Sequence, residues 1–558
     1  MKTTRRGALG ALLGAGATVA ATGQSAQAAP AQPAAPGCAG DWSRLRWGVG
    51  FEGQRKPDLG DGTFLNPLIS GDHPDPSILR DGANYYLTFS SFDAYPGLPL
   101  WKSNDLVNWQ PVGPTLNKPV GSVWAPELVK HGERYYNYFH ARTPQYRSLY
   151  VITAEKIEGP WSDPVDLKLH AHIDPGHAVG EDGKRYLFLS NGDRVRLTDD
   201  GLATDGAVEH VYDPWRYPPE WDVETFAPEG PKVLRHGEYF YLILAVGGTA
   251  GPPTGHMVIV ARSRSIHGPW ENAPHNPMIR TVSATEKWWS RGHATAVEAP
   301  DGSWWMVYHG YENGFWTLGR QTLLDPVHWT ADGWLVADGG DLSRPLRKPG
   351  VKARIAPLPH GAPLSDDFSG KTLRQQWSFY DPGPEEAQRL RFEPGALVVR
   401  GKGSHPRDAS PLTFLAGDLR YQFEVDVEVI GEAHAGVLLF YNRRLYCGLG
   451  FDARRFVMHR YGLERNRGRP AGASRKLRLR VTLDHHVATF HWREGGAAAD
   501  APWNKYDVQM EVSGYHHNVA GDFLSLRPGI YVAGSGEARF SDLRFAAGSA
   551  VLPTLLQR

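Results

Sequence analysis

Five short segments of the chain share one pattern and follow one another at intervals of roughly 50 to 65 residues. In each segment a glycine is followed three residues later by an aromatic residue, within a run rich in aromatic and β-branched side chains. The glycines are Gly82, Gly132, Gly183, Gly237 and Gly302. The aromatic residues are Tyr85, Tyr135, Tyr186, Phe240 and Trp305. A turn glycine that leads into such a run is typical of a β-hairpin.

One hairpin in each unit of about 50 residues is the signature of a β-propeller blade. The five units therefore predict an all-β chain in which residues 60–350 form a five-bladed β-propeller. Closing the ring of blades protects the sheet edges and leaves a central funnel lined by the innermost strands. A long β-sandwich is the alternative, but it does not account for five units of similar length.

The composition is that of a folded protein and excludes several classes. Hydrophobic residues make up 41% of the chain and charged residues 22%, which does not fit a disordered protein. Lys+Arg and Asp+Glu both number 60, whereas a nucleic-acid-binding protein would need a basic surface. Two cysteines exclude a disulfide-rich scaffold and a zinc cluster, and whether Cys38 and Cys447 pair is left open.

Residues 1–28 have the features of an export signal. A positively charged start that contains Arg5 and Arg6 precedes an apolar run rich in Gly and Ala, and Ala26-Gln27-Ala28 fits a cleavage site. The paired arginines predict a twin-arginine signal and a secreted protein. A membrane anchor is the weaker interpretation, and no later run reaches about 18 apolar residues, so no membrane association is expected. Residues 29–59 are predicted to be a linker and N-terminal extension.

A carboxylate or a histidine stands a few residues before each of the five turn glycines. These residues are Asp75, Glu127, Asp174, Glu229 and His293. The strand before each turn lies nearest the axis of a propeller, so we expect them to meet at one mouth of the funnel. Like charges at short range separate their pKa values, which lets one carboxylate act as a base and another as an acid. Hydrolysis of a glycosidic bond needs such a pair, although Asp and Pro are also common in ordinary turns.

The motifs that hold these residues resemble glycoside hydrolase family 43, whose catalytic domain is a five-bladed propeller. They read GDHPDPS, WAPE, IDPGHA, APEGPKV and GHATAVEAPDGSWWMVYHG, and the resemblance covers about residues 60–350. It implies that Asp75 is the general base, Glu229 the general acid, and Asp174 the carboxylate that tunes the acid and orients the substrate. In IDPGHA, the pair Gly176-His177 departs from the family pattern.

The same resemblance implies the residues that bind substrate. His293 matches a histidine near the propeller axis, and Arg320, in GRQTLLDPVHW, matches an arginine that contacts the bound sugar. Trp124, Phe92 and the pair Trp288-Trp289 are candidate platforms for stacking on a sugar ring, with core packing as the alternative for each.

The activity implied is that of a secreted, inverting exo-glycosidase that releases terminal xylose or arabinose from plant cell-wall material. Its carbohydrate substrate would be derived from xylan or arabinan. No cofactor is required and no metal ligand is assigned, although a structural calcium ion would be compatible with the fold. A non-catalytic carbohydrate-binding propeller and the same chemistry on a galactan are the alternatives.

A second domain is predicted after the propeller. Residues 351–364 are rich in Pro and basic side chains and are predicted to be a linker. The alternating patterns in residues 365–558 predict a β-sandwich. Its layout resembles the lectin-like jelly-roll of family 43 β-xylosidases, which packs against the propeller and can lend residues to the active-site rim. An independent carbohydrate-binding module is the alternative, and the oligomeric state is not predicted.

Overall fold

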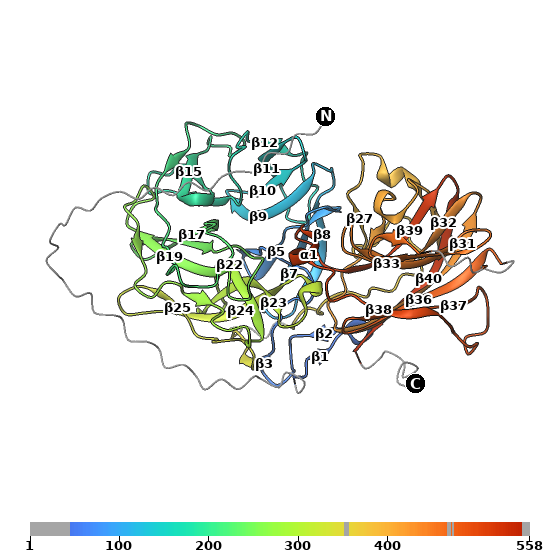
Figure 1. Cartoon of the computed structure of the whole chain (residues 1–558). Coiled ribbons are helices and arrows are strands. Elements are labelled where there is room, and N and C mark those ends of the chain that lie inside the picture. The colour runs from blue at the N-terminus through green and yellow to red at the C-terminus, as the bar shows by residue number, and fades with distance from the viewer. Residues whose placement is uncertain (1–44, 351–355, 466–469, 471–473, 549–558) are drawn as a thin grey trace, which may run out of the picture. The chain divides into compact units, whose positions relative to one another are not determined.

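Five antiparallel sheets follow one another along the first half of the chain (Figure 1). The structure, a computed structural model, describes residues 45–350, 356–465, 470 and 474–548. In every sheet a turn glycine lies in the hairpin between the first two strands, with φ values of 61°, 59°, 73°, 59° and 87° from Gly82 to Gly302. Glycine adopts this left-handed conformation without a steric penalty. The five hairpins are therefore blade hairpins, and the predicted five-bladed propeller is confirmed.

The strands of the first two blades, from the innermost outwards, are β4 (Ser77–Asp81), β5 (Asn84–Thr88), β7 (Gly97–Ser103) and β8 (Gln110–Leu116), then β9 (Ser122–His131), β10 (Arg134–Arg142), β11 (Arg147–Ala154) and β12 (Val165–Asp166). The third and fourth blades contain β13 (Gly176–Val179), β14 (Arg185–Phe188), β15 (Asp193–Arg196) and β16 (Glu209–His210), then β17 (Glu229–His236), β18 (Tyr239–Val246), β19 (Met257–Ser263), β20 (Glu271–Asn272) and β21 (Ile279–Arg280). The fifth blade contains β22 (Trp288–Glu298), β23 (Trp304–Glu312), β24 (Arg320–Trp329) and β25 (Leu335–Ala337).

Glu127 on β9 joins four blades at the propeller axis. Its Oε2 accepts a hydrogen bond from Ser77 Oγ at 3.1 Å and lies 2.5 Å from the Nζ atom of Lys232. Its Oε1 accepts a hydrogen bond from the backbone N–H of His177 at 3.2 Å. These three partners belong to β4, β17 and β13. Glu127 is thus a buried carboxylate neutralised by a buried lysine.

We expect Glu127→Ala to lower the free energy of unfolding by about 3–5 kcal/mol, because it leaves the buried Lys232 ammonium without its counter-charge. Urea unfolding followed by tryptophan fluorescence would measure the change. The double variant Glu127→Ala/Lys232→Met removes both charges and should recover part of the loss. An unfolding midpoint of Glu127→Ala equal to that of the wild type would contradict this role.

The second half of the chain forms a β-sandwich of two antiparallel sheets, as predicted (Figure 1). One sheet has the order β35 (Leu463–Glu464), β34 (Phe456–Arg460), β33 (Tyr446–Phe451), β32 (Ala433–Phe440), β39 (Arg527–Gly534), β30 (Leu412–Thr413), β27 (Ser378–Tyr380) and β6 (Ala94–Tyr95). The other has the order β28 (Leu390–Glu393), β29 (Ala396–Arg400), β40 (Glu537–Ala547), β31 (Arg420–Ile430), β36 (Lys476–Asp484), β37 (Val487–Glu494) and β38 (Asn504–Glu511).

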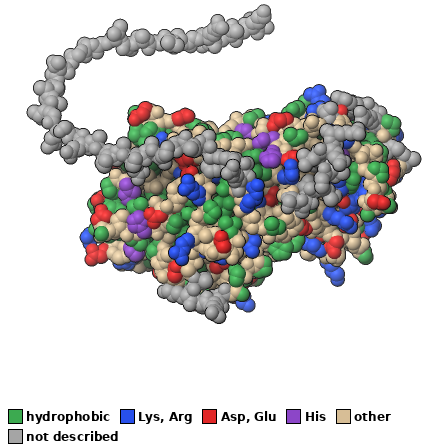
Figure 2. Space-filling view, turned by 90° about the horizontal axis from the view of Figure 1, so that it is seen from below, with side chains coloured by type: hydrophobic (Ala, Val, Ile, Leu, Met, Phe, Trp, Pro, Cys, Tyr) green, Lys and Arg blue, Asp and Glu red, His purple; other side chains and the backbone are tan. Residues whose placement is uncertain are grey.

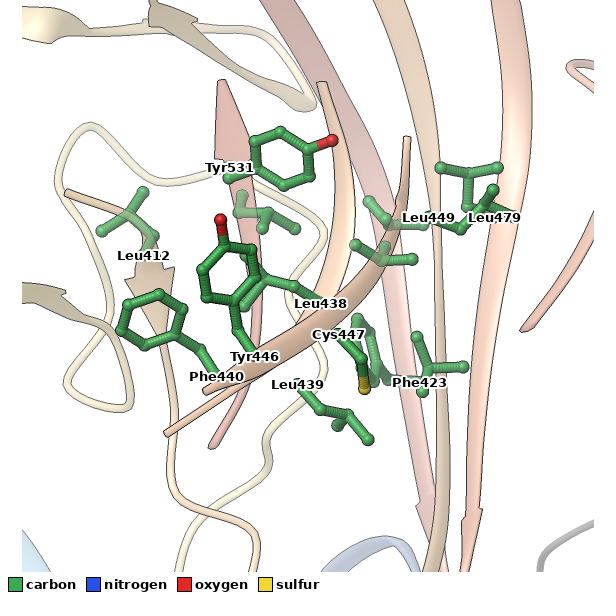
Figure 3. Close-up of a cluster of buried hydrophobic side chains, with 14 of the residues drawn as sticks. Leu412, Phe423, Leu438, Leu439, Phe440, Tyr446, Cys447, Leu449, Leu479 and Tyr531 are labelled. Atoms are coloured by element: carbon green, nitrogen blue, oxygen red, sulfur yellow. The ribbon is translucent and has the colours of Figure 1, made fainter. Parts of the chain in front are cut away.

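The core of the sandwich is apolar and contains one cysteine. Figure 3 shows Cys447 on β33 beside Leu439 and Phe423, and its side chain is fully buried. Burial raises the pKa of the Cys447 thiol to about 12. Cys38, the other cysteine, lies outside the described residues, so the pairing of the two stays open.

The sandwich and the propeller share a strand. β6 belongs to the loop that follows β5 in the first blade, yet it pairs with β27, with Tyr95 opposite Phe379 and Ala94 opposite Tyr380. The described residues of the propeller and the sandwich accordingly belong to one compact unit. This pairing agrees with a C-terminal domain that packs on the propeller, and it does not suit an independent binding module.

The described part of the predicted N-terminal extension is folded. It forms β1 (Gly48–Val49), the 3₁₀ turn η2 (Phe51–Gly53) and β2 (Arg55–Lys56), while β3 (Thr63–Phe64) pairs with β26 (Leu346–Arg347). The backbone N–H of Arg55 donates to Asp418 in the sandwich at 2.9 Å, and its guanidinium donates to Glu312 of the fifth blade at 2.8 Å. This segment therefore contacts both domains.

Basic and acidic side chains are interspersed over the face drawn in Figure 2, in keeping with a net charge of zero. Among the described residues, no helix is long and apolar enough to cross a membrane, and α1 (His517–Ala520) is the one α-helix.

Candidate active site

Three of the predicted site residues share an unusual backbone conformation at similar places in their blades. Asp75, Asp174 and His293 have φ values of 55°, 56° and 57°. In the fourth blade the residue after Glu229 is Gly230, with φ of 61°, and a Cβ atom there would lie 2.9 Å from the His293 ring. Left-handed conformations of residues other than glycine are strained and cluster at functional sites. The same backbone conformation thus recurs at three of the predicted site residues.

One cavity of about 180 Å³ brings most of the predicted site residues together. The predicted residues in its wall are Asp75, Asp174, Glu229, His293, Arg320, Phe92 and Trp124. Trp288 and Trp289, the other candidate platforms, do not line it, and Trp288 is buried in the propeller core. Of the five residues that the repeat predicted to meet, Asp75, Asp174, Glu229 and His293 line this cavity, whereas Glu127 does not and pairs with Lys232 instead.

Asp75 is buried among hydrogen-bond donors. Its Oδ1 accepts a hydrogen bond from Arg320 Nη1 at 2.8 Å and lies 3.1 Å from His309 Nδ1. Its Oδ2 accepts a hydrogen bond from Ser90 Oγ at 2.5 Å. Burial alone would raise the pKa of Asp75, but the Arg320 guanidinium holds it well below its usual value. Asp75 is therefore an ionised carboxylate able to accept a proton.

Glu229 and Asp174 have the opposite electrostatics. Burial, followed by the negative charges of Asp174 and Asp75, raises the pKa of Glu229 well above its usual value. Burial and the charge of Asp75 raise the pKa of Asp174 to about 7, although Lys232 and the backbone N–H of Gly230 oppose the rise. Glu229 is thus the carboxyl group of the cavity that most readily keeps a proton.

His293 lies between the carboxyl groups. Its Nδ1 is 3.5 Å from Asp75 Oδ1 and 3.9 Å from Asp174 Oδ2. Burial lowers the pKa of His293 to about 3, so the ring is neutral. One ligand-type atom from each of Asp174, Glu229 and His293 lies within 4.8 Å of the others, a spacing that would also admit a cation. We assign no metal ligand, and the expectation that no cofactor is needed stays a prediction.

The aromatic wall of the cavity includes a residue that the sequence did not reveal. Phe523, from the loop between α1 and β39 of the sandwich, stacks on Phe92 at 6.0 Å and meets Trp124 edge-on at 5.7 Å. The Arg320 guanidinium lies over the rings of Phe92 and Phe523, at 5.4 and 5.2 Å from their centroids. The resemblance indicated a contribution from the second domain without indicating this residue.

Two polar partners of Asp75 were also missed. His309 lies on β23 within a quoted motif, and Ser90 lies two residues before Phe92. The Nδ1 atom of His309 accepts the backbone N–H of Asp75 at 3.1 Å, and its Nε2 lies 3.2 Å from Thr249 Oγ1. The pattern of residues before the turn glycines could not indicate His309 and Ser90, because both follow their turn glycine, on or just after the second strand of the blade.

The departure at Gly176-His177 has a steric reason. A Cβ atom at position 176 would lie 2.0 Å from the carbonyl oxygen of Pro231, so a side chain cannot fit there without a shift of the backbone. His177 is buried, and its Nε2 accepts a hydrogen bond from Arg185 Nε at 3.1 Å. Both residues therefore pack the blades and do not line the cavity.

Comparisons with known proteins agree with this architecture. The family model "Glycosyl hydrolases family 43" matches residues 64–335, and the model "Beta xylosidase C-terminal Concanavalin A-like domain" matches residues 365–546. A crystal structure of a family 43 protein from Bacillus licheniformis is 26% identical, with a TM-score of 0.77 over 87% of this chain and all of that one.

Two curated relatives are similar over much of the chain. A non-reducing end α-L-arabinofuranosidase from Bacteroides ovatus is 33% identical over 365 residues, which cover 61% of this chain and 65% of the relative. A xylan 1,3-β-xylosidase from a Vibrio species is 31% identical over 385 residues, which cover 61% of this chain and 69% of the relative. The chain belongs to glycosyl hydrolases family 43 and is a glycoside hydrolase.

Proposed function

We propose that this chain is an inverting exo-glycosidase that removes terminal xylose or arabinose from plant cell-wall polysaccharide or oligosaccharides. The observation that carries the proposal is electrostatic. In one cavity, Asp75 is held ionised by Arg320 while burial and neighbouring carboxylates keep a proton on Glu229. The names of the two relatives, one an arabinofuranosidase and one a xylosidase, support the choice of sugars.

In the proposed mechanism Asp75 takes a proton from a water molecule as the water attacks the anomeric carbon. Glu229 gives its proton to the departing oxygen on the opposite face of the sugar. Inverting enzymes keep such a pair about 6.5–9.5 Å apart so that the water fits between base and sugar. Asp174 would keep the acid protonated and orient the substrate. His293, Arg320 and the aromatic residues Trp124 and Phe92 would bind the sugar.

The small cavity supports attack at a chain end. Phe92, Trp124 and Phe523 form a continuous aromatic wall beside the carboxyl groups. Such a wall suits stacking on one sugar ring, whereas an endo-acting enzyme would need an open groove. Secretion through the segment of residues 1–28, which lies outside the described residues, is part of the proposal and rests on the sequence alone.

The direct test is hydrolysis of two aryl glycosides, a β-D-xylopyranoside and an α-L-arabinofuranoside, by the purified mature chain. We expect the chain to hydrolyse at least one of them. The Glu229→Gln variant should no longer hydrolyse the disaccharide of the same sugar. ¹H NMR of xylobiose hydrolysis should show α-xylose as the first product, because an inverting enzyme reverses the anomeric configuration.

The outcomes separate the remaining alternatives. Release of β-xylose first would contradict inversion. Hydrolysis of an aryl β-galactoside alone would favour the same chemistry on a galactan. Inactivity on all three glycosides would contradict the proposed substrate class.

A further inference from the structure

An arginine of the sandwich lies close behind the site, in contact with a buried aspartate of the propeller. Arg527, the first residue of β39, donates from Nη2 to Asp72 Oδ2 at 3.1 Å. Both side chains are largely buried, with exposed fractions of 10% for Arg527 and 2% for Asp72. Asp72 lies in the GDHPDPS motif, three residues before Asp75, so this ion pair joins the second domain to the segment that carries Asp75.

The other oxygen of Asp72 holds the backbone of Arg320. Asp72 Oδ1 accepts the N–H of Arg320 at 3.2 Å, while the carbonyl oxygen of Arg320 accepts the N–H of His73 at 2.9 Å. A Cβ atom on Gly319 would lie 2.3 Å from Asp72 Oδ1, so the chain passes directly over this carboxylate. Both ends of the Arg320 main chain are thus fixed by residues 72 and 73.

We propose that Arg527 is a positioning residue for catalysis. It holds Asp72, which fixes the backbone of Arg320, and the Arg320 guanidinium in turn holds Asp75. Arg527 does not line the active-site cavity and acts through Asp72. The inference rests on the proposed role of Asp75 as the base. It makes the sandwich a part of the catalytic centre through charge as well as through the aromatic wall.

The physical basis of the proposal is the burial of the Asp72–Arg527 ion pair. Burial raises the pKa of Asp72, and the charges of Arg527 and Arg320 oppose that rise. Without Arg527, the buried Asp72 would lose its side-chain counter-ion, and such a loss is strongly unfavourable. Asp72 would then take up a proton or turn away, and either change loosens the backbone of Arg320.

A neighbouring cavity offers a specific test. Asp72, Arg527 and Ser90 border a cavity of about 280 Å³ between the two domains, whose wall also includes the exposed side chain of Phe51. In Arg527→Ala, this cavity gives a small cation a route to Asp72. A guanidinium ion matches the charge and the planar hydrogen-bonding geometry of the side chain that was removed.

We expect Arg527→Ala to lower kcat/KM by about 10- to 100-fold, mainly through kcat, as for other residues that orient a catalytic group. Guanidinium chloride, far below concentrations that unfold proteins, should restore part of the lost rate, and sodium chloride at equal ionic strength should not. Arg527→Lys should retain more activity than Arg527→Ala. In Asp72→Asn/Arg527→Ala, guanidinium should have no effect, because the carboxylate that would bind it is gone.

His486→Ala is the matched control. His486 Nε2 lies 2.8 Å from the carbonyl oxygen of Gly314, a contact between the same two domains that does not involve Asp72. This variant should keep its kcat/KM. Unchanged kinetics of Arg527→Ala would overturn the inference, as would a loss that neither guanidinium nor Arg527→Lys restores. Activity of Asp75→Asn is measured in parallel: if that variant stays active, the proposed function fails instead.

Discussion

Glu229→Gln should lower kcat on xylobiose by about 10²–10⁴-fold, because an amide cannot protonate the departing oxygen. The loss should depend on the leaving group. The dinitrophenolate of a dinitrophenyl glycoside is a stable anion and can depart with little protonation. Hydrolysis of that substrate should therefore be much less affected. The fall of kcat/KM at high pH should also disappear, since in the wild type it follows loss of the proton that burial, Asp174 and Asp75 retain on Glu229.

Steady-state kinetics on the two substrates over a range of pH would measure these effects. Thermal unfolding serves as the control for folding, and Glu229→Gln should unfold no earlier than the wild type because it removes a carboxyl group from a cluster of like charges. Equal losses on xylobiose and on the dinitrophenyl glycoside would argue against Glu229 as the acid.

Asp75→Asn should also lower kcat by orders of magnitude, but by similar factors on both substrates. The attacking water needs a base whatever the leaving group, and an amide is not basic. The two variants therefore have different signatures: dependence on the leaving group for the acid, and independence of it for the base. The same pair of substrates measures both.

Asp75→Asn leaves the buried guanidinium of Arg320 without its carboxylate, so folding needs a separate control. Circular dichroism and calorimetric titration with xylose would show whether the variant keeps its fold and binds sugar. Wild-type turnover of the dinitrophenyl glycoside by a folded Asp75→Asn variant would contradict its role as the base.

The ring of blades and the convergence of its carboxylates could be predicted because both follow from a repeat. Asp75, Asp174 and Glu229 occur at similar distances before their turn glycines, and a closed ring places similar positions around one axis. Glu127 lies somewhat closer to its turn glycine and is neutralised by Lys232 from another blade. Whether a carboxylate at the axis is free or paired depends on a side chain that reaches it from a neighbouring strand, and sequence spacing does not report that contact.

Contributions from the second domain could not be predicted residue by residue. Phe523 and Arg527 meet Phe92 and Asp72 across more than four hundred residues of chain. Their positions depend on the register of β39 and on the loop before it, neither of which leaves a local pattern. The pairing of β6 with β27 is hidden for the same reason, since two residues of a loop carry no strand signal.

That pairing has a consequence for the order of synthesis. β6 leaves the ribosome long before β27 and spends that interval without its partner, and the adjoining loop carries Phe92. The propeller can therefore close before its aromatic wall is in place. During translation the carboxylates, Phe92 and Trp124 are made first, and the aromatic wall is completed only when Phe523 arrives near the end of the chain.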